Sequence, residues 1–586
     1  MKKIKSLLLI LLFTIINLSV ALATDIDLSN IKIDKNGLIK QSCYKIHAIY
    51  PSANQINTLN DFPGNRGPHQ LIIYKPEWSD RTGTNEFGKE AVVVNDVVVE
   101  LTGADSIIPK NGYVISAHGL AKDWMNKNIQ IGTKIKIEEE NNIVRAYTTV
   151  DSYRQGAKIK IEEIEEVIKN LKKENMTFNE KKVRICLKDA KKYYRKSRGN
   201  GKIALMSAVE SMKMSETALK YSLPYVESEL RGVWLRPVEK TRAEVVSTLE
   251  DMKKIGINAI FLETYFHGKT IFPSDTMDKY GFNRQNRIFN GEDILAYYIQ
   301  EAHKRNIQVH VWFESFYIGN VSPSVDEKNI LAVKPEWGNK NKINADSTEP
   351  VFHPTEHKGY FLDPANPEVT TFLKELITEI SAKYAIDGFN IDYIRYPQTP
   401  KNSEEFYETS SWGYTKYARE EFKSRHGVDP VKIKCNSQMW REWDRYRQGK
   451  INSYIKSLKN ILKYREIMVS AVIFPDEEQS KETKQQNWSE WAEKGYIDAL
   501  TPLILTSDNK LSKKMMKEVK KKAKGETKVY PGIFVGFMDG EPEDLIRQIH
   551  NMRTLNLGGI ILFDYAHLDK KYTNYLDTSV FSTVSD

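Results

Sequence analysis

The feature that most constrains this chain is a regular alternation of strand-like and helix-like segments that begins after Glu229. Eight short apolar runs have the length and β-branched composition of buried strands. They are Arg231–Leu235, Ala259–Glu263, Gln308–Phe313, Gly388–Asp392, Met468–Val472, Ala499–Leu505, Val529–Val535 and Gly559–Phe563. Amphipathic stretches between them are Arg242–Ile255, Asp293–Arg305, Pro367–Tyr384, Trp440–Tyr464, Trp488–Lys494, Leu511–Lys524 and Pro542–Leu555.

Eight strands and seven intervening helices over about 350 residues are the count of a (β/α)₈ barrel, or TIM barrel, of the α/β class. An open doubly wound sheet is the alternative. It is disfavoured because the first strand is followed by "RGVWLRPVEKT" rather than by a glycine-rich phosphate loop.

Two regions with different patterns precede the barrel segment. Short β-branched runs separated by turn sequences predict a small β-rich accessory domain over residues 43–150. Residues 158–225 have helical spacing, with Ile161, Ile164 and Ile168 on one face, and predict a helical connector. The predicted order is a signal peptide at 1–23, the β-rich domain, the connector, and the barrel at 229–580.

The first residues have the three parts of a secretory signal. Lys2, Lys3 and Lys5 precede the apolar run Leu7–Val20, and Ala21-Leu22-Ala23 forms an A-x-A cleavage sequence. This predicts a secreted or cell-surface bacterial protein cleaved near Ala23. No later stretch approaches the roughly 20 apolar residues of a spanning helix. The alternative that remains for membrane attachment is an uncleaved signal that anchors the chain.

Charge and cysteine content exclude several classes of function and of stabilising site. The formal charge of +9 is spread over a chain with 86 basic and 77 acidic residues, so a nucleic-acid partner is not expected. The segment from Arg154 to Tyr225 contains 18 basic and 9 acidic residues. This excess indicates either a solvated helix face or attraction to an anionic cell-wall polymer. Three distant cysteines, Cys43, Cys186 and Cys435, predict neither a disulfide framework nor a zinc site.

Active sites of TIM barrels lie at the carboxyl ends of the strands. Residues two apart on a strand point the same way, so His310, Trp312 and Glu314 are expected to face the barrel axis, as are Asn390 and Asp392. An inward carboxylate is costly to bury, which favours a catalytic role for Asp392. The structural alternative is an ion pair with Arg395 or Arg236.

Carboxylates framed by Trp and Tyr side chains are typical of sugar chemistry, in which two acids act on a glycosidic bond and aromatic faces stack on sugar rings. Residues at the strand ends are accordingly predicted to bind substrate. They are Trp234, Arg236, Glu263, Tyr265, His310, Trp312, Asn390, Tyr393, Arg395, Asp564 and Tyr565.

An ordered set of motifs resembles the bacterial glycosyl hydrolase-like 10 family, exported TIM-barrel proteins related to the α-galactosidase-like superfamily. The motifs are "ELRGVWL", "INAIFLETY", "HVWFE", "DGFNIDYIRYP", "YIDALTPLI" and "GGIILFDY", from Glu229 to Tyr565. Nearer the N-terminus, "TGTNEFGKEAVV" and "IPKNGYVISAHG" are similar to segments of the phosphodiester glycosidase family.

The first resemblance implies hydrolysis of O-glycosidic bonds, with Asp392 as the nucleophile. This chain has Ile391-Asp392 where the family often has two adjacent aspartates. The acid/base partner is not determined by a motif: Asp476 and Glu314 are the leading candidates, and Glu263 and Asp564 follow.

The predicted function is therefore that of an exported glycoside hydrolase acting on a polysaccharide, with cell-wall glycan among the candidate substrates. A non-catalytic carbohydrate-binding surface protein is the alternative. A metal-assisted hydrolase using His310, Glu314 and Asp392 is disfavoured, because neither an H-x-H nor an H-E-x-x-H spacing is present. No metal or cofactor is expected, since nucleotide and flavin fingerprints are missing from the sequence.

Overall fold

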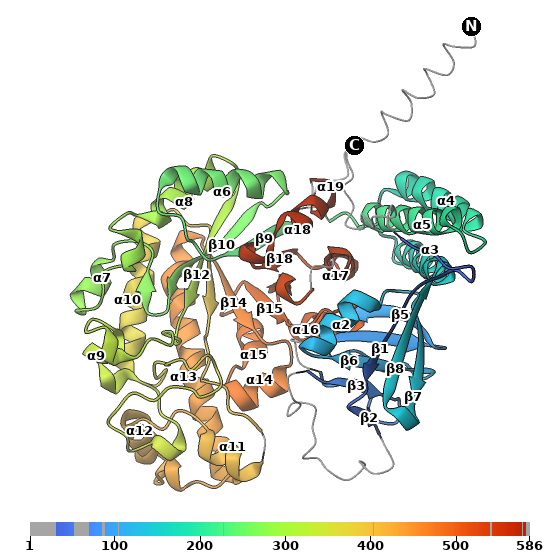
Figure 1. Ribbon diagram of the computed structural model, residues 1–586. Coiled ribbons are helices and arrows are strands. Elements are labelled where there is room, and N and C mark those ends of the chain that lie inside the picture. Colours follow the sequence, from blue (N-terminus) through green and yellow to red (C-terminus); the bar gives the residue numbers. More distant parts are fainter. Residues whose placement is uncertain are drawn as a thin grey trace.

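The computed structural model describes residues 31–51, 69–84, 88–103, 105–226, 228–401, 403–538, 542–576 and 578–581. The predicted signal peptide lies outside these residues. A large barrel, a β-sheet and a group of three long helices make up the described part of the chain (Figure 1).

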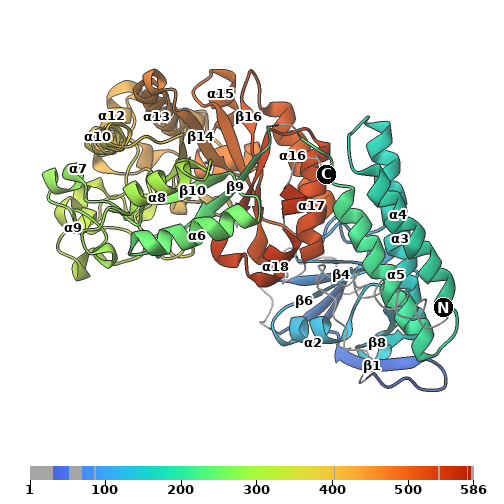
Figure 2. The same ribbon diagram turned by 90° about the horizontal axis from the view of Figure 1, so that it is seen from above.

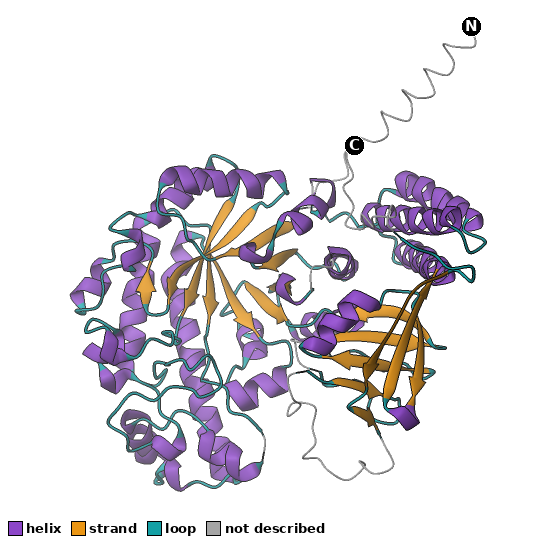
Figure 3. Cartoon of the chain, in the orientation of Figure 1, coloured by secondary structure: helices purple, strands orange, loops and turns teal. Residues whose placement is uncertain are grey.

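Eight parallel strands form the barrel: β9 (Leu230–Leu235), β10 (Ala259–Phe266), β12 (Gln308–Glu314), β13 (Gly388–Asp392), β14 (Met468–Ile473), β15 (Ala499–Ile504), β17 (Gly532–Phe534) and β18 (Gly559–Phe563). They pair in this order, and β9 pairs with both β10 and β18, which closes the sheet. The strands converge toward one axis with helices outside them (Figure 3). The predicted (β/α)₈ barrel is confirmed.

The surrounding helices are α6 (Arg242–Lys254), α8 (Ile294–His303), α10 (Pro367–Lys383), α13 (Gln438–Leu462), α15 (Trp488–Glu493), α16 (Asn509–Lys522) and α17 (Pro542–Thr554). The seventh predicted strand is shorter than expected. Lys528–Val529 (β16) pairs with β15 and is separated from β17 by Pro531, which has no backbone N–H to continue the ladder.

Further short elements interrupt the regular order at the carboxyl ends of the strands. They are β11 (Lys269–Thr270), α7 (Asp275–Lys279), α9 (Ile330–Val333), α11 (Glu404–Ser410), α12 (Lys416–His426), α14 (Glu477–Lys484) and α18 (Lys570–Tyr575). α19 (Thr578–Phe581) follows α18. The strand-to-helix connections that contain them begin at the carboxyl ends of the barrel strands.

Aromatic side chains fill the barrel interior. Among them, the Asn390 side chain on β13 forms hydrogen bonds with side chains of three other strands. Trp234 donates its indole N–H to Asn390 Oδ1 at 3.1 Å, while Asn390 Nδ2 donates to Ser470 Oγ at 2.9 Å and to Thr501 Oγ1 at 3.1 Å. All four side chains are buried. Buried polar groups are costly to leave unpaired, so this network determines how the four strands align.

Asn390→Ala should lower the free energy of unfolding by about 2–4 kcal/mol, because it leaves a cavity and unpaired donors and acceptors in the barrel interior. Chemical denaturation monitored by tryptophan fluorescence measures this change. Asn170→Ala, at an exposed position in a helix, should change stability by less than about 0.5 kcal/mol. An equal effect of the two substitutions would contradict the network's role.

The N-terminal sheet has eight strands in the order β1-β8-β7-β5-β4-β6-β3-β2. They are β1 (Leu38–Lys45), β2 (Ala48–Tyr50), β3 (Leu71–Tyr74), β4 (Lys89–Val94), β5 (Val97–Thr102), β6 (Gly112–Ala117), β7 (Lys134–Glu138) and β8 (Ile143–Thr149), with α2 (Leu120–Asn128) following β6. The β-rich region is thus present. The segments similar to phosphodiester glycosidases contain most of β4 and all of β6, and these two strands pair with each other.

Three helices follow the sheet: α3 (Val150–Lys173), α4 (Glu180–Lys196) and α5 (Lys202–Tyr221). α3 begins directly after β8, where Thr149 and Ser152 form a capping box. In Figure 2 the sheet and these helices lie on the side of the barrel formed by α16, α17 and α18. None of the helices in the described ranges is both long and apolar enough to span a membrane.

Candidate active site

Arg236 and Glu263 form an ion pair at the mouth of the barrel. Arg236 follows β9, and its guanidinium donates to both carboxylate oxygens of Glu263 on β10, at 2.5 and 2.9 Å. The Glu263 side chain is fully buried, whereas that of Arg236 is 47% exposed and lies over the Trp312 ring at 5.3 Å. Arg236 thus presents a cation above an indole while Glu263 holds it in place.

Glu314 ends β12 and is buried with a single hydrogen-bond donor. Its Oε2 accepts from the backbone N–H of His267 at 2.9 Å. Among the described residues, no cationic side chain lies within ion-pair distance of it. Burial, with the nearby charges of Glu263 and Asp392, raises the pKa of Glu314 well above its ordinary value. These surroundings therefore favour the protonated form of the Glu314 carboxyl group.

Asp392 ends β13 in register with Glu314 on the adjacent strand. It accepts two hydrogen bonds, from Trp312 Nε1 at 2.9 Å and from the backbone N–H of Tyr393 at 2.6 Å. Burial raises the pKa of Asp392, while these two donors work in the opposite direction by stabilising the carboxylate. Unlike Glu314, Asp392 is partly accessible.

The backbone N–H donors of the two acids come from residues in the left-handed region. His267 has φ 49° and Tyr393 has φ 45°, conformations that are rare for side chains of this size. Each turns the chain sharply after a strand, so that its N–H is directed at a carboxylate. Such strain is concentrated at functional sites. No residue pattern in the sequence indicated these two turns.

The two arginines considered as ion-pair partners of Asp392 pair with other carboxylates. Arg236 pairs with Glu263, and Arg395 pairs with Glu356, a residue that sequence reasoning missed. In the described part of the chain neither arginine lies within ion-pair distance of Asp392. Arg395 is buried among three aromatic rings, those of Phe361, Tyr393 and Phe474, at 4.8–5.7 Å. Its charge is therefore neutralised by Glu356.

Glu356→Gln should destabilise the protein by about 3–5 kcal/mol, because it leaves the buried Arg395 charge unpaired. Although burial acts in the opposite direction, Arg395 holds the pKa of Glu356 at about 2. The carboxylate therefore contributes stability above its ordinary pKa of about 4.3, and this contribution is lost as the pH falls toward 2. Denaturation between pH 3 and 7 measures both effects.

Glu482→Gln is the matched control, since Glu482 forms an ion pair with Lys401 in which both side chains are about half exposed. It should cost less than about 1 kcal/mol. A loss of stability in Glu356→Gln no greater than in this control would contradict the buried-pair interpretation.

Four sequence-predicted residues lie away from this cluster. Asp476 is exposed, and its Oδ1 accepts from Gln479 N at 3.1 Å as the N-cap of α14. Asn390 and His310 lie deeper in the barrel, His310 stacked on Phe261 with ring centroids 4.6 Å apart. A register shift between Glu263 and Tyr265 turns Tyr265 outward, where it stacks on Phe313.

The remaining predicted residues line the interior or its rim. Trp234 and Trp312 are buried in the barrel, in edge contact with the Phe563 ring. Asp564 is buried, and its negative charge helps to raise the pKa of Glu263, whose main cause is burial. Its Oδ1 contacts His567 Nδ1 at 2.6 Å. Tyr565 is half-buried in the connection after β18.

Sequence reasoning missed an aromatic group beside Asp392. Tyr317 stacks on Tyr393 with centroids 4.5 Å apart, and Phe361 contacts both rings. Tyr317 and Phe361 belong to the long connection between β12 and α10, which has no strand periodicity to indicate its position. Flat aromatic surfaces next to a carboxylate suit the faces of sugar rings. Among the described residues, no group of three His, Cys, Asp or Glu side chains has the geometry of a metal site.

A closed (β/α)₈ barrel with acids and aromatic rings at the carboxyl ends of its strands is the arrangement typical of TIM-barrel glycoside hydrolases. The chain belongs to the glycosyl hydrolase-like 10 family, whose model matches residues 229–548. The resemblance found in the sequence motifs is thereby confirmed.

Two relatives carry the name glycosyl hydrolase. DigH of Escherichia coli K12 is 25% identical over 207 residues, which are 29% of this chain and 43% of DigH. YngK of Bacillus subtilis is 23% identical over 316 residues, 48% of this chain and 55% of YngK. The chain thus spans about half the length of these relatives. Among solved structures, the PgaB (BpsB) glycoside hydrolase domain from Bordetella bronchiseptica aligns with a TM-score of 0.43 and 12% identity, covering 61% of this chain and 100% of that domain.

Proposed function

We propose that this protein is a secreted or cell-surface glycoside hydrolase that cleaves O-glycosidic bonds of a polysaccharide. Asp392 acts as the nucleophile and Glu314 as the acid/base. The observation that carries the proposal is the contrast between two acids in register on adjacent strands at the barrel mouth. Neither acid has an ion-pair partner among the described residues. Burial raises the pKa of both, but only Asp392 has two donors, Trp312 Nε1 and the Tyr393 N–H, that stabilise its anionic form.

Glu314 suits the acid because burial raises its pKa and keeps a proton available for the leaving-group oxygen. Asp392 suits the nucleophile because Trp312 and the Tyr393 N–H stabilise its anionic form, and because it is the more accessible of the two. A protonated carboxyl group paired with an ionised one is the recurring solution for glycoside hydrolysis.

The other residues of the site would bind substrate. Arg236, held by Glu263 and only half-buried, offers N–H donors to sugar hydroxyls. The stacked pair of Tyr317 and Tyr393 offers an aromatic surface beside Asp392. Asp476, an exposed helix cap, is the weaker acid/base candidate, because its carboxylate already accepts from the first turn of α14.

Cell-wall glycan and neutral polysaccharides are both candidate substrates. Release of reducing ends from purified cell-wall glycans, with and without stem peptides, and from neutral polysaccharides tests the activity and names the substrate class. Product analysis by NMR gives the anomeric outcome, which should be retention if Asp392 is a nucleophile. Glycan binding without release by the wild type would contradict the proposal and favour a non-catalytic binding protein.

A further inference from the structure

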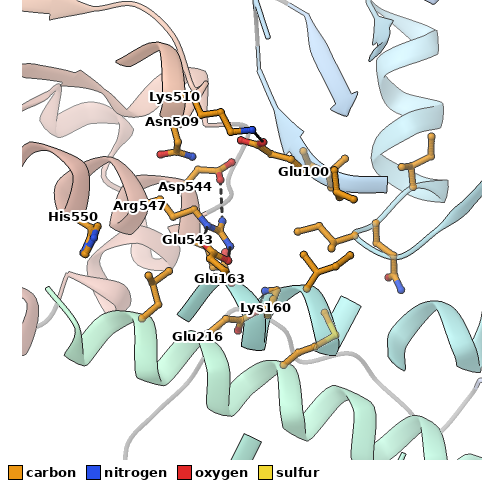
Figure 4. A pocket seen from close by; sticks show the side chains of 18 of the residues that line it. Glu100, Lys160, Glu163, Glu216, Asn509, Lys510, Glu543, Asp544, Arg547 and His550 are labelled. Atoms are coloured by element: carbon orange, nitrogen blue, oxygen red, sulfur yellow. Dashed lines mark hydrogen bonds and ion pairs between the residues drawn. The ribbon is translucent and has the colours of Figure 1, made fainter. Parts of the chain in front are cut away.

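A large cavity lies outside the barrel mouth, where the three parts of the described chain meet. It has a volume of about 1030 Å³ and is bounded by α16 and α17 of the barrel, by α3 and α5, and by residues of β1, β5 and β8 of the N-terminal sheet. Figure 4 shows side chains from all three parts directed into it. Pockets for small ligands usually measure roughly 300–1,000 Å³. The cavity is therefore large enough for a ligand the size of a short oligosaccharide.

The carboxylates that line this cavity already have partners. Arg547 donates to Glu163 at 2.7 Å and to Asp544 at 3.1 Å, and Lys510 donates to Glu100 at 3.1 Å (Figure 4). Two more pairs complete the set: Lys160 donates to Glu216, and the Tyr575 hydroxyl donates to Glu543. The acidic side chains are thus largely compensated within the wall.

Three lysines of α16 on the same wall have no such compensation. Lys513, Lys514 and Lys517 line the cavity, and none has a carboxylate within ion-pair distance in the part of the chain that the structure describes. Burial and the like charge of Lys517 lower the pKa of Lys513, with Glu174 acting in the opposite direction. Of the three, Lys513 is half-buried and Lys514 and Lys517 are exposed. Positive charges that lie close together attract an anion.

Polar atoms without partners lie in the same cavity wall. Glu216 Oε2, Asn509 Oδ1 and His550 Nδ1 are buried, and none has a hydrogen-bond partner among the residues that the structure describes. Burial lowers the pKa of His550 to about 4, so its ring is neutral near pH 7. Buried polar atoms in proteins nearly always have partners. The carboxylate and amide oxygens are acceptors, and hydroxyl groups are the donors that best suit them.

We propose that this cavity is a second binding site, separate from the barrel mouth, for an acidic saccharide. Its carboxylate or phosphate group would contact Lys513 and Lys517, and its hydroxyl groups would donate to Glu216 and Asn509. The site combines lysine side chains for charge recognition with carboxylate and amide oxygens for hydroxyl recognition. This inference does not depend on the proposed hydrolysis, because none of these residues lies at the barrel mouth.

Isothermal titration calorimetry of the full chain, after any signal cleavage, tests the proposal. The probes are trigalacturonate, glucose 6-phosphate, neutral maltotriose and inorganic phosphate, at low and at high salt. Binding of trigalacturonate or glucose 6-phosphate should be at least about tenfold tighter than binding of maltotriose or of inorganic phosphate, and salt should weaken it. The two charged sugars distinguish a carboxylate-bearing ligand from a phosphate-bearing one.

Lys513→Ala combined with Lys517→Ala should weaken this binding at least about tenfold, whereas Lys513→Arg with Lys517→Arg should retain most of it. Lys521→Ala with Lys524→Ala removes the same charge from residues outside the cavity lining and should change affinity less than about twofold.

Three results would overturn the proposal. One is that no charged sugar binds. Another is that inorganic phosphate or maltotriose binds as tightly as the charged sugars. The last is that the cavity pair and the control pair of lysine variants weaken binding equally.

Discussion

Asp392→Asn should lower turnover by about 10³-fold or more while glycan affinity changes less than about threefold. The asparagine keeps the size of the side chain, and its oxygen can still accept from Trp312 Nε1 or Tyr393 N, so the local fold should persist. What it loses is the anionic oxygen that attacks the sugar. Initial rates of reducing-end release and calorimetric glycan titration measure the two quantities.

Two further variants make the result interpretable. Asp251→Asn, on the outer face of α6 in an exposed pair with Lys254, should leave both turnover and affinity unchanged. Asp476→Asn should cost less than about tenfold if Asp476 only caps α14, and far more if it is the acid/base. Turnover by Asp392→Asn within tenfold of the wild type would remove Asp392 from the chemistry.

Glu314→Gln should lower turnover by about 10²–10⁴-fold on natural glycans. The loss should be much smaller on aryl glycosides with acidic phenol leaving groups, because these depart without a proton. Rates of the wild type and the variant on a series of leaving groups measure this difference. An equal loss on every leaving group would contradict the role of Glu314 as the acid.

The pH profile tests the same assignment independently. The wild type should be active only while Glu314 is protonated, so its rate should fall as the pH rises through the raised pKa of this group. Asp392 must be ionised, so the rate should also fall as the pH drops through the pKa of Asp392, which burial raises. A bell-shaped profile results, and Glu314→Gln should remove its basic limb alone.

Much of the barrel was predictable because strand and helix periodicity are local properties of a chain. The bounds of β13 and β18 agree with the expected strands, and the seven expected helices are present. The seventh strand was predicted too long, since an apolar run cannot reveal where Pro531 interrupts pairing. The long connections that follow the strand ends were not predicted, because they lack a repeating pattern.

The sequence alone determined the fold class, the family and the strand ends at which acids stand. The tertiary structure decided which of those acids share an environment. Arg236 pairs with Glu263, and Arg395 with Glu356. Within the described ranges Asp392 therefore keeps two hydrogen-bond donors and no ion pair. The register shift in β10 turned Tyr265 away. Side-chain periodicity is set by neighbours along the chain, whereas protonation state depends on burial and on charges brought from distant segments.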